Sequence, residues 1–312
     1  MAFKHDIEKR FIESTPVKGF IHLSKRIYIP SFKNLSLYEL WPAFRLQLKK
    51  TSLLERASAI SFNVFMAIPP TLIFAFTLIP YLPISGQFIE QLFGIIRDVV
   101  PGQRNNSVII EFLRDFLTQP RNELLSFGLL IALFFSSSAM MGVLRSFDKN
   151  YEGFSKRTGI QKRKTALRLT IIVYFLVFLC LSLLIAQGVV LEWLGIKNYA
   201  IRNAVVNLRW VIIVLLLFFS VAFIYRQGAP VAIKWPYITP GSLLATVLMI
   251  LATILVSVYV NNFGSYNKLY GSISAIFIIM SFIYVNALVV LLGFELNVTI
   301  TSLQAKAARE TI

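Results

Sequence analysis

Six long apolar segments constrain the fold of this chain more than any other feature of its sequence. They cover residues 57–80, 124–144, 167–191, 208–225, 238–260 and 273–300. Each is close to or longer than the roughly 20 residues with which a helix crosses about 30 Å of hydrocarbon. No soluble core could bury so much apolar surface, and 56% of the residues are hydrophobic. The sequence therefore predicts an all-α integral membrane protein with six transmembrane helices.

Basic residues are divided unequally between the two sides of the predicted membrane domain. Of the 31 Lys and Arg residues, 23 fall on the side that holds both termini and 8 on the other. The positive-inside rule therefore predicts that both termini are cytoplasmic. The net charge of +16 is then explained by topology and by attraction to anionic lipid headgroups. No nucleic-acid partner is predicted.

Three regions are predicted along the chain. Residues 1–50 form a cytoplasmic extension, 51–302 a six-helix membrane domain and 303–312 a short cytoplasmic tail. In the extension, Ser36 and Glu39 have the spacing of a capping box and precede an apolar stripe made by Leu40, Trp41, Phe44 and Leu48. With basic residues beside it, the stripe predicts an amphipathic helix that lies on the membrane surface or binds a partner.

The connection between the first two spans is predicted to be external and helical. Within residues 85–119, two apolar stripes separated by Pro101 and Gly102 predict two amphipathic helices. Charged residues interrupt both stripes, so neither is predicted as a further span. The two helices either cap an outward-facing cavity or lie on the lipid surface.

Proline and polar residues interrupt the apolar character of the first two spans. Pro69 and Pro70 remove backbone hydrogen bonds near the middle of the first span, which predicts a kink there. Asn63 lies earlier in the same span, and Gly142 follows three serines in the second. Tight helix packing is one explanation for these residues. A polar site that includes Asn63 is the other.

The last apolar segment carries a single ionisable residue, Glu295. A carboxylate at membrane depth is costly to bury and is by default a candidate functional residue. Helical spacing places Asn286 and Asn297 on the opposite face, which predicts that this helix is central in the bundle. Arg56 and Arg145 are candidate partners at cytoplasmic helix ends. Glu295 is then either half of a structural ion pair or a carboxylate that couples transport to a proton or cation.

The motifs of several catalytic classes are missing from the sequence. The only histidines are His5 and His22, and there is no His-x-His-x-Asp motif, Gly-rich phosphate loop or G-x-S-x-G turn. We therefore predict that the protein is not an enzyme and has no metal or cofactor. The single cysteine, Cys180, is predicted to be a small buried apolar residue.

Three stretches of sequence resemble a known family. They are Arg56–Phe62 (RASAISF) at the start of span one, Ser137–Tyr151 (SSAMMGVLRSFDKNY) at the end of span two, and Tyr270–Ala275 (YGSISA) leading to Leu292–Asn297 (LGFELN). Together they resemble the YihY/BrkB family of bacterial inner-membrane proteins, some of them labelled virulence factor BrkB or ribonuclease BN. The family usually has a small residue where Phe294 stands. The resemblance implies six spans, both termini inside and the bacterial inner membrane.

Two classes of function follow. The first is a transporter or exporter of a lipid or an anionic envelope-related solute, because the resembled family is linked with envelope and serum resistance. A cavity lined by Asn63, Asn286 and Glu295 would favour this class. The second is a non-transporting envelope-stress or scaffold protein, which a solid bundle with Glu295 fully paired would favour. The sequence specifies neither the substrate nor an oligomeric state.

The predicted topology can be tested with inserted reporters. A tag placed within residues 150–164 should report cytoplasm, and one within residues 102–106 should report the exterior, because the basic residues are concentrated on the former side. Protease protection and cysteine accessibility in intact cells would measure both positions. The reverse pattern, or an odd number of crossings, would contradict the predicted architecture.

Overall fold

The computed structural model describes residues 37–78, 122–149, 151, 154–155, 157–193, 199–231, 233–262 and 273–310. The predicted external helices of residues 85–119, and the extension before residue 37, lie outside these residues. Seven helices are described: α3 (Leu37–Lys50), α4 (Leu53–Leu78), α7 (Asn122–Phe147), α8 (Gly159–Trp193), α9 (Tyr199–Gly228), α10 (Pro240–Asn262) and α12 (Ile273–Glu310). Within the described residues the only β-type pairing is an isolated bridge between Phe154 and Val231. The all-α class is therefore confirmed.

Five of these helices are long and apolar enough to cross a membrane. They are α4, α7, α9, α10 and α12. The remaining predicted span, residues 167–191, falls within the 35-residue helix α8. The last helix also continues past the predicted boundary at residue 302, because α12 runs to Glu310. α4 includes Pro69 and Pro70 within one continuous helix, and the kink predicted there stays a prediction.

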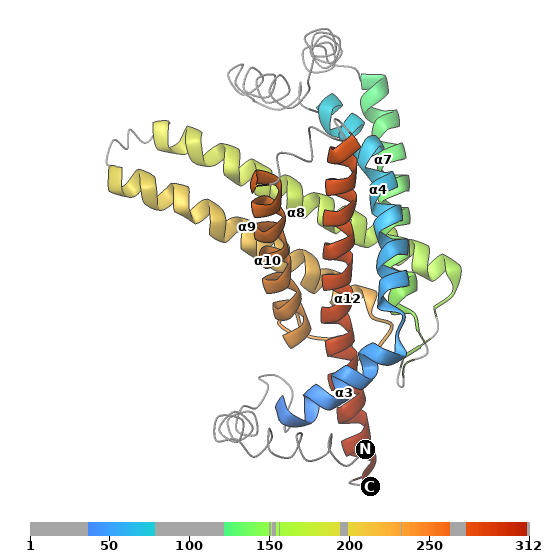
Figure 1. Cartoon of the computed structure of the whole chain (residues 1–312). Coiled ribbons are helices and arrows are strands. Elements are labelled where there is room, and N and C mark those ends of the chain that lie inside the picture. The colour runs from blue at the N-terminus through green and yellow to red at the C-terminus, as the bar shows by residue number, and fades with distance from the viewer. Residues whose placement is uncertain are drawn as a thin grey trace.

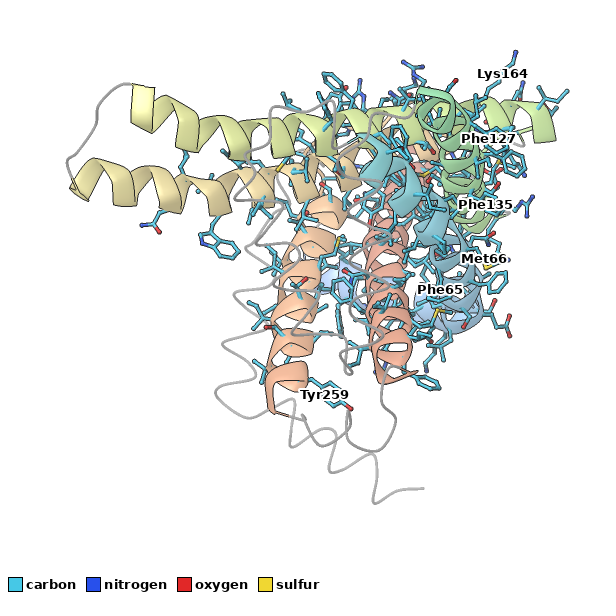
Figure 2. All side chains as sticks on the ribbon, turned by 90° about the horizontal axis from the view of Figure 1, so that it is seen from above. Phe65, Met66, Phe127, Phe135, Lys164 and Tyr259 are labelled. Atoms are coloured by element: carbon cyan, nitrogen blue, oxygen red, sulfur yellow. The ribbon has the colours of Figure 1, made fainter. Side chains whose placement is uncertain are left out.

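The long helices form an upright group and an oblique pair. In Figure 1, α4, α7, α10 and α12 run roughly alongside one another, whereas α8 and α9 slope away together to one side. The view from above in Figure 2 shows the same pair leaving the group, and it shows Met66 and Phe127 pointing away from the bundle. Both of these side chains are exposed, as expected for groups that face lipid acyl chains.

One end of the bundle brings together the end of α7, the segment before α8 and the end of α9. Gly228 at the end of α9 packs against Phe147 at the end of α7. The segment before α8 pairs with the segment after α9 through Ser155, whose amide donates to the Pro230 carbonyl at 2.8 Å. Arg157 donates to three carbonyls at the end of α9, those of Gln227, Gly228 and Ala229, at 2.8–3.1 Å. These contacts satisfy carbonyls that a helix end leaves without partners.

Helices α10 and α12 cross with their backbones in close contact. A Cβ atom added to Gly241 would collide with the Gly293 carbonyl oxygen, and one added to Gly293 would meet the Gly241 oxygen and the Tyr225 hydroxyl. Tyr225 of α9 donates to the Val290 carbonyl of α12 at 2.6 Å. Small residues at a crossing allow dense packing where the hydrophobic effect does not drive helices together.

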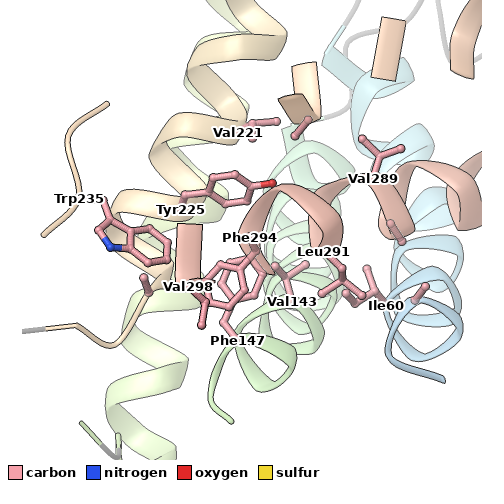
Figure 3. Packing of buried hydrophobic residues seen from close by; sticks show 14 residues of the cluster. Ile60, Val143, Phe147, Val221, Tyr225, Trp235, Val289, Leu291, Phe294 and Val298 are labelled. Carbon is pink, nitrogen blue, oxygen red and sulfur yellow. The ribbon is translucent and has the colours of Figure 1, made fainter. Parts of the chain in front are cut away.

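An aromatic cluster fills the bundle just beyond this crossing. Phe294 of α12 is fully buried, and its ring stacks on Phe147 of α7 with centroids 3.7 Å apart. Tyr225 and Trp235 pack edge-on or tilted against the same ring, as Figure 3 shows. A large residue at position 294 therefore joins α7, α9, α12 and the segment before α10 in one apolar core.

We expect Gly293→Ala to lower the thermal stability of the purified protein in detergent. The added methyl group would overlap the Gly241 oxygen, the Tyr225 hydroxyl and the Ala245 Cβ atom, and overpacking of this kind costs about 1–3 kcal/mol. Gly128→Ala is the matched control, because its nearest neighbour would be the Phe74 Cα atom at 3.8 Å. Equal melting temperatures for the two variants would contradict the close crossing.

Candidate functional site

The Glu295 carboxylate lies at the centre of a buried polar cluster. Its side chain is fully buried, and Arg56 of α4 forms an ion pair with its Oε1 atom at 2.5 Å. Tyr151, which follows α7, donates to the same oxygen at 2.6 Å. Gln47 of α3 donates to Oε2 at 3.0 Å. Both carboxylate oxygens therefore have partners, drawn from three different parts of the chain.

Arg56 extends the cluster to a further helix. Its Nη2 atom donates to the Ser146 carbonyl oxygen of α7 at 2.6 Å, while Nη1 pairs with Glu295. One guanidinium thus joins α4, α7 and α12 at the same level. Its Nε atom is buried without a hydrogen-bond partner among the described residues. We call the set Gln47, Arg56, the Ser146 carbonyl, Tyr151 and Glu295 the carboxylate cluster.

Helix α3 is positioned by apolar contacts with α12. Leu40 is buried and packs with Ile300, Leu296 and Leu303, and Phe44 is also buried. Trp41, predicted to share this stripe, is 64% exposed because the contact with α12 covers only part of the helix. The packing brings Gln47 to the carboxylate, and the Thr51 hydroxyl donates to the Gln47 carbonyl at the end of α3.

The electrostatics of the cluster favour a structural ion pair. Burying one charge alone is costly, whereas a buried pair with extra hydrogen bonds recovers much of that cost. Burial and the nearby Glu295 carboxylate raise the pKa of the Tyr151 hydroxyl, which lies after α7. The phenol therefore stays protonated at neutral pH and continues to donate to Glu295. Glu295 is thereby held by three donors at once.

The other predicted site residues lie elsewhere. Arg145 is exposed and is not among the partners of Glu295. The Asn297 amide joins α12 to the start of α10: its Oδ1 accepts from the Gly241 amide, and its Nδ2 donates to the Thr239 hydroxyl, both at 2.9 Å. Asn63 donates to the Ala59 carbonyl in its own helix. Of the six predicted candidates, the structure brings together only Arg56 and Glu295.

A cavity of about 630 Å³ lies between the long helices. Its walls come from α4, α7, α8, α9, α10 and α12, and its lining is almost entirely apolar. The polar lining residues are Thr71, Ser136, Thr170, Tyr174, Thr253 and Asn286. Asn286 lines the cavity, but Asn63 and Glu295 do not. The cavity and the carboxylate cluster are therefore separate features.

One end of the cavity lies close to the aromatic cluster and to the carboxylate cluster. Ile60 and Val143 line the cavity and also belong to the apolar core that contains Phe147 and Phe294. Ile60 is one helical turn from Arg56 on α4. Thr71, also in the cavity wall, lies about 16 Å further along the same helix at 1.5 Å per residue. The cavity thus begins beside the aromatic rings and extends away from Glu295.

Sequence reasoning missed Gln47, Tyr151 and the Ser146 carbonyl as partners of Glu295. Ser146 contributes a backbone atom, which no side-chain pattern reports. Tyr151 is the last residue of the second stretch that resembles the family. Its place in that stretch was the one feature of the sequence that could have pointed to a role at the site. No group of three or more His, Cys, Asp or Glu side chains that could hold a metal ion occurs in the described part of the chain.

The model of the family described as "Virulence factor BrkB" matches residues 45–311. This chain belongs to the BrkB family. It is 27% identical over 249 residues to a putative ribonuclease-like protein, YfkH, of Bacillus subtilis, covering 78% of this chain and 88% of that relative. Two relatives called UPF0761 membrane protein, from Chromohalobacter salexigens and Azotobacter vinelandii, are 26% and 25% identical.

Coverage of these two BrkB relatives is partial. The matches span 78% of this chain but only 58% of the Chromohalobacter and Azotobacter proteins. No solved structure matches the chain. Membership of the BrkB family therefore supports a multi-pass membrane protein, and the residues that matter must be argued from this chain itself.

We expect Glu295→Gln and Arg56→Gln each to lower the free energy of unfolding by about 3–5 kcal/mol, because each leaves a buried charge without its partner. Thermal unfolding in detergent would measure the loss. Arg145→Gln is the matched control, since it removes a basic side chain that is exposed, and it should leave stability nearly unchanged. A stable, well-inserted Glu295→Gln protein would show that the ion pair is not structural.

Proposed function

We propose that this chain transports or exports a lipid-like amphiphile in the bacterial inner membrane. The supporting observation is the apolar cavity of about 630 Å³ between the long helices. A cavity of this size is within the range of sites that hold one small molecule, and an apolar wall with a few polar groups is typical of such sites. Membership of a membrane-protein family agrees with this assignment.

We further propose six spans with both termini in the cytoplasm. Arg56 near the start of α4 contacts Ser146 near the end of α7 and Glu295 in the second half of α12, which supports an alternating path with an even number of crossings. The excess of Lys and Arg on that side supports its cytoplasmic position. Basic residues there, including the exposed Lys164 and Arg168, would contact anionic headgroups of the bilayer.

In this proposal the carboxylate cluster closes the cytoplasmic end of the cavity. Glu295 lies outside the cavity wall and has partners for both oxygens. Of its two predicted roles, this position favours the structural ion pair over a coupling carboxylate in contact with the substrate. Arg56 would hold α4, α7 and α12 together while the cavity is occupied. No coupling ion is assigned.

The second candidate function is a non-transporting scaffold or envelope-stress protein. The observation that favours it is the same complete pairing of Glu295, together with the dense core around Phe294. In that case the cavity would be a packing feature that no molecule needs to enter. We also propose, on the sequence grounds given above, that the protein is not a ribonuclease, although one relative has a ribonuclease-like name.

Filling the cavity distinguishes the two candidates. Ala139 lines it from α7 and is buried, so Ala139→Trp should occupy part of the space. If the protein exports a lipid-like molecule, cells that carry this variant should show the membrane lipid composition of cells without the protein. Lipid mass spectrometry of isolated membranes would measure this.

The matched control is Leu130→Trp, which places the same side chain on an exposed position of the same helix and should behave as the unmodified protein. Ala67→Trp on α4 fills the cavity from another wall and guards against a folding defect in one variant. Unchanged lipid composition in folded, inserted cavity-filled variants would contradict transport and favour the scaffold.

A further inference from the structure

Three hydroxyl groups from three helices meet in the cavity wall. They belong to Thr71 of α4, Ser136 of α7 and Tyr174 of α8, and all three residues line the cavity. The Ser136 and Tyr174 oxygens are 2.6 Å apart, and each lies 3.2 Å from the Thr71 oxygen. We call this group the hydroxyl trio.

The hydrogen atoms of the trio are already committed. Thr71 donates to the Ala67 carbonyl of its own helix at 2.7 Å. Only the hydrogens of Ser136 and Tyr174 remain for the three contacts within the trio, since each hydroxyl has one donor and two acceptor lone pairs. All three hydroxyl hydrogens of the trio are therefore occupied, whereas some of the lone pairs on its three oxygen atoms remain without a donor. The trio presents acceptors to a molecule in the cavity.

The other polar side chains of the cavity wall donate hydrogen bonds within their own helices. Thr170 donates to the Ala166 carbonyl, Thr253 to Met249, and Asn286 through Nδ2 to Phe282. The trio differs from them because its contacts run between helices. Among the described lining residues, the trio is the place where polar side chains of three helices come together.

Among the described residues, no charged side chain lines the cavity. A carboxylate or phosphate inside it would lose its water without gaining a basic partner, which is strongly unfavourable. Arg56, whose charge is already paired with Glu295, lies about 22 Å from Thr71 along α4 at 1.5 Å per residue. A neutral group that donates a hydrogen bond would meet the trio without this penalty.

We propose that the hydroxyl trio binds the neutral, hydroxyl-bearing end of a single-chain amphiphile whose hydrocarbon chain fills the apolar remainder of the cavity. This rests on the proposed function, in which the cavity holds a lipid-like molecule, and it specifies the chemistry of the polar end. The alcohol hydroxyl donates to a free lone pair of the trio. An anionic headgroup is excluded from this position.

The test compares two photoreactive probes of equal chain length. One is a long-chain alcohol and the other the corresponding carboxylic acid, each with a diazirine in the chain. The purified full-length protein in nanodiscs of neutral lipid is irradiated with each probe at about pH 9, where a carboxylic acid is largely ionised. Mass spectrometry then locates labelled peptides. The alcohol should label the peptides of the cavity wall at least about five-fold more than the acid. The alcohol gains one hydrogen bond to the trio, whereas the charged acid is disfavoured in the apolar cavity.

Variants of the trio supply the decisive comparison. Ser136→Ala and Tyr174→Phe should each reduce labelling of the cavity peptides by the alcohol by roughly five-fold. Thr253→Val is the matched control, because it removes a hydroxyl from the same cavity that lies outside the trio, and it should retain the preference. Ala139→Trp, which fills part of the cavity, should reduce cavity labelling by both probes.

Two results would overturn the inference in different ways. If both probes label the cavity equally, and Ala139→Trp reduces the labelling by both, the trio does not select the polar end although the cavity does hold amphiphiles. The proposed function would then survive without this specificity. If neither probe labels the cavity wall while lipid-facing peptides are labelled, the trio proposal and the lipid-like substrate both fail.

Discussion

The ion pair between Arg56 and Glu295 is the contact on which the arrangement of this bundle depends. In a bilayer, apolar helices gain little by exchanging lipid for protein, so polar contacts and close packing decide which faces meet. Arg56 reaches the Glu295 carboxylate and the Ser146 carbonyl together, and the carboxylate also holds Gln47 and Tyr151. A single buried pair therefore aligns α3, α4, α7 and α12 at one level.

The remainder of the bundle is held by packing of a different kind. Where Gly241 faces Gly293, α10 and α12 are joined by backbone contact and by the Asn297 amide. The pair α8 and α9 slopes away from the upright helices (Figure 1), and side chains from all six long helices border the cavity. The helices are thus joined closely around Phe294 and diverge where the cavity lies between them.

The helices were predictable from the sequence because a bilayer allows few alternatives for long apolar segments. The central position of α12 also followed from polar residues on two faces, since Glu295 and Asn297 are both buried against protein. The choice between Arg56 and Arg145 was not predictable, because it depends on how α4 and α7 are rotated. The cavity could not be foreseen either. Its lining is scattered over six helices and is mainly apolar. Asn63, which was predicted to line it, instead donates to a carbonyl of its own helix.

The stacked rings of Phe147 and Phe294 have a consequence for how the helices can move relative to one another. Phe147 is the last residue of α7, whereas Phe294 lies well inside α12, so the stack joins the end of one helix to the middle of another. Both rings also contact Tyr225 of α9. A sideways shift of α7, α9 or α12 alone would break aromatic contacts, each worth about 0.5–1.5 kcal/mol beyond the buried area, whereas a shift of the three helices together would keep them.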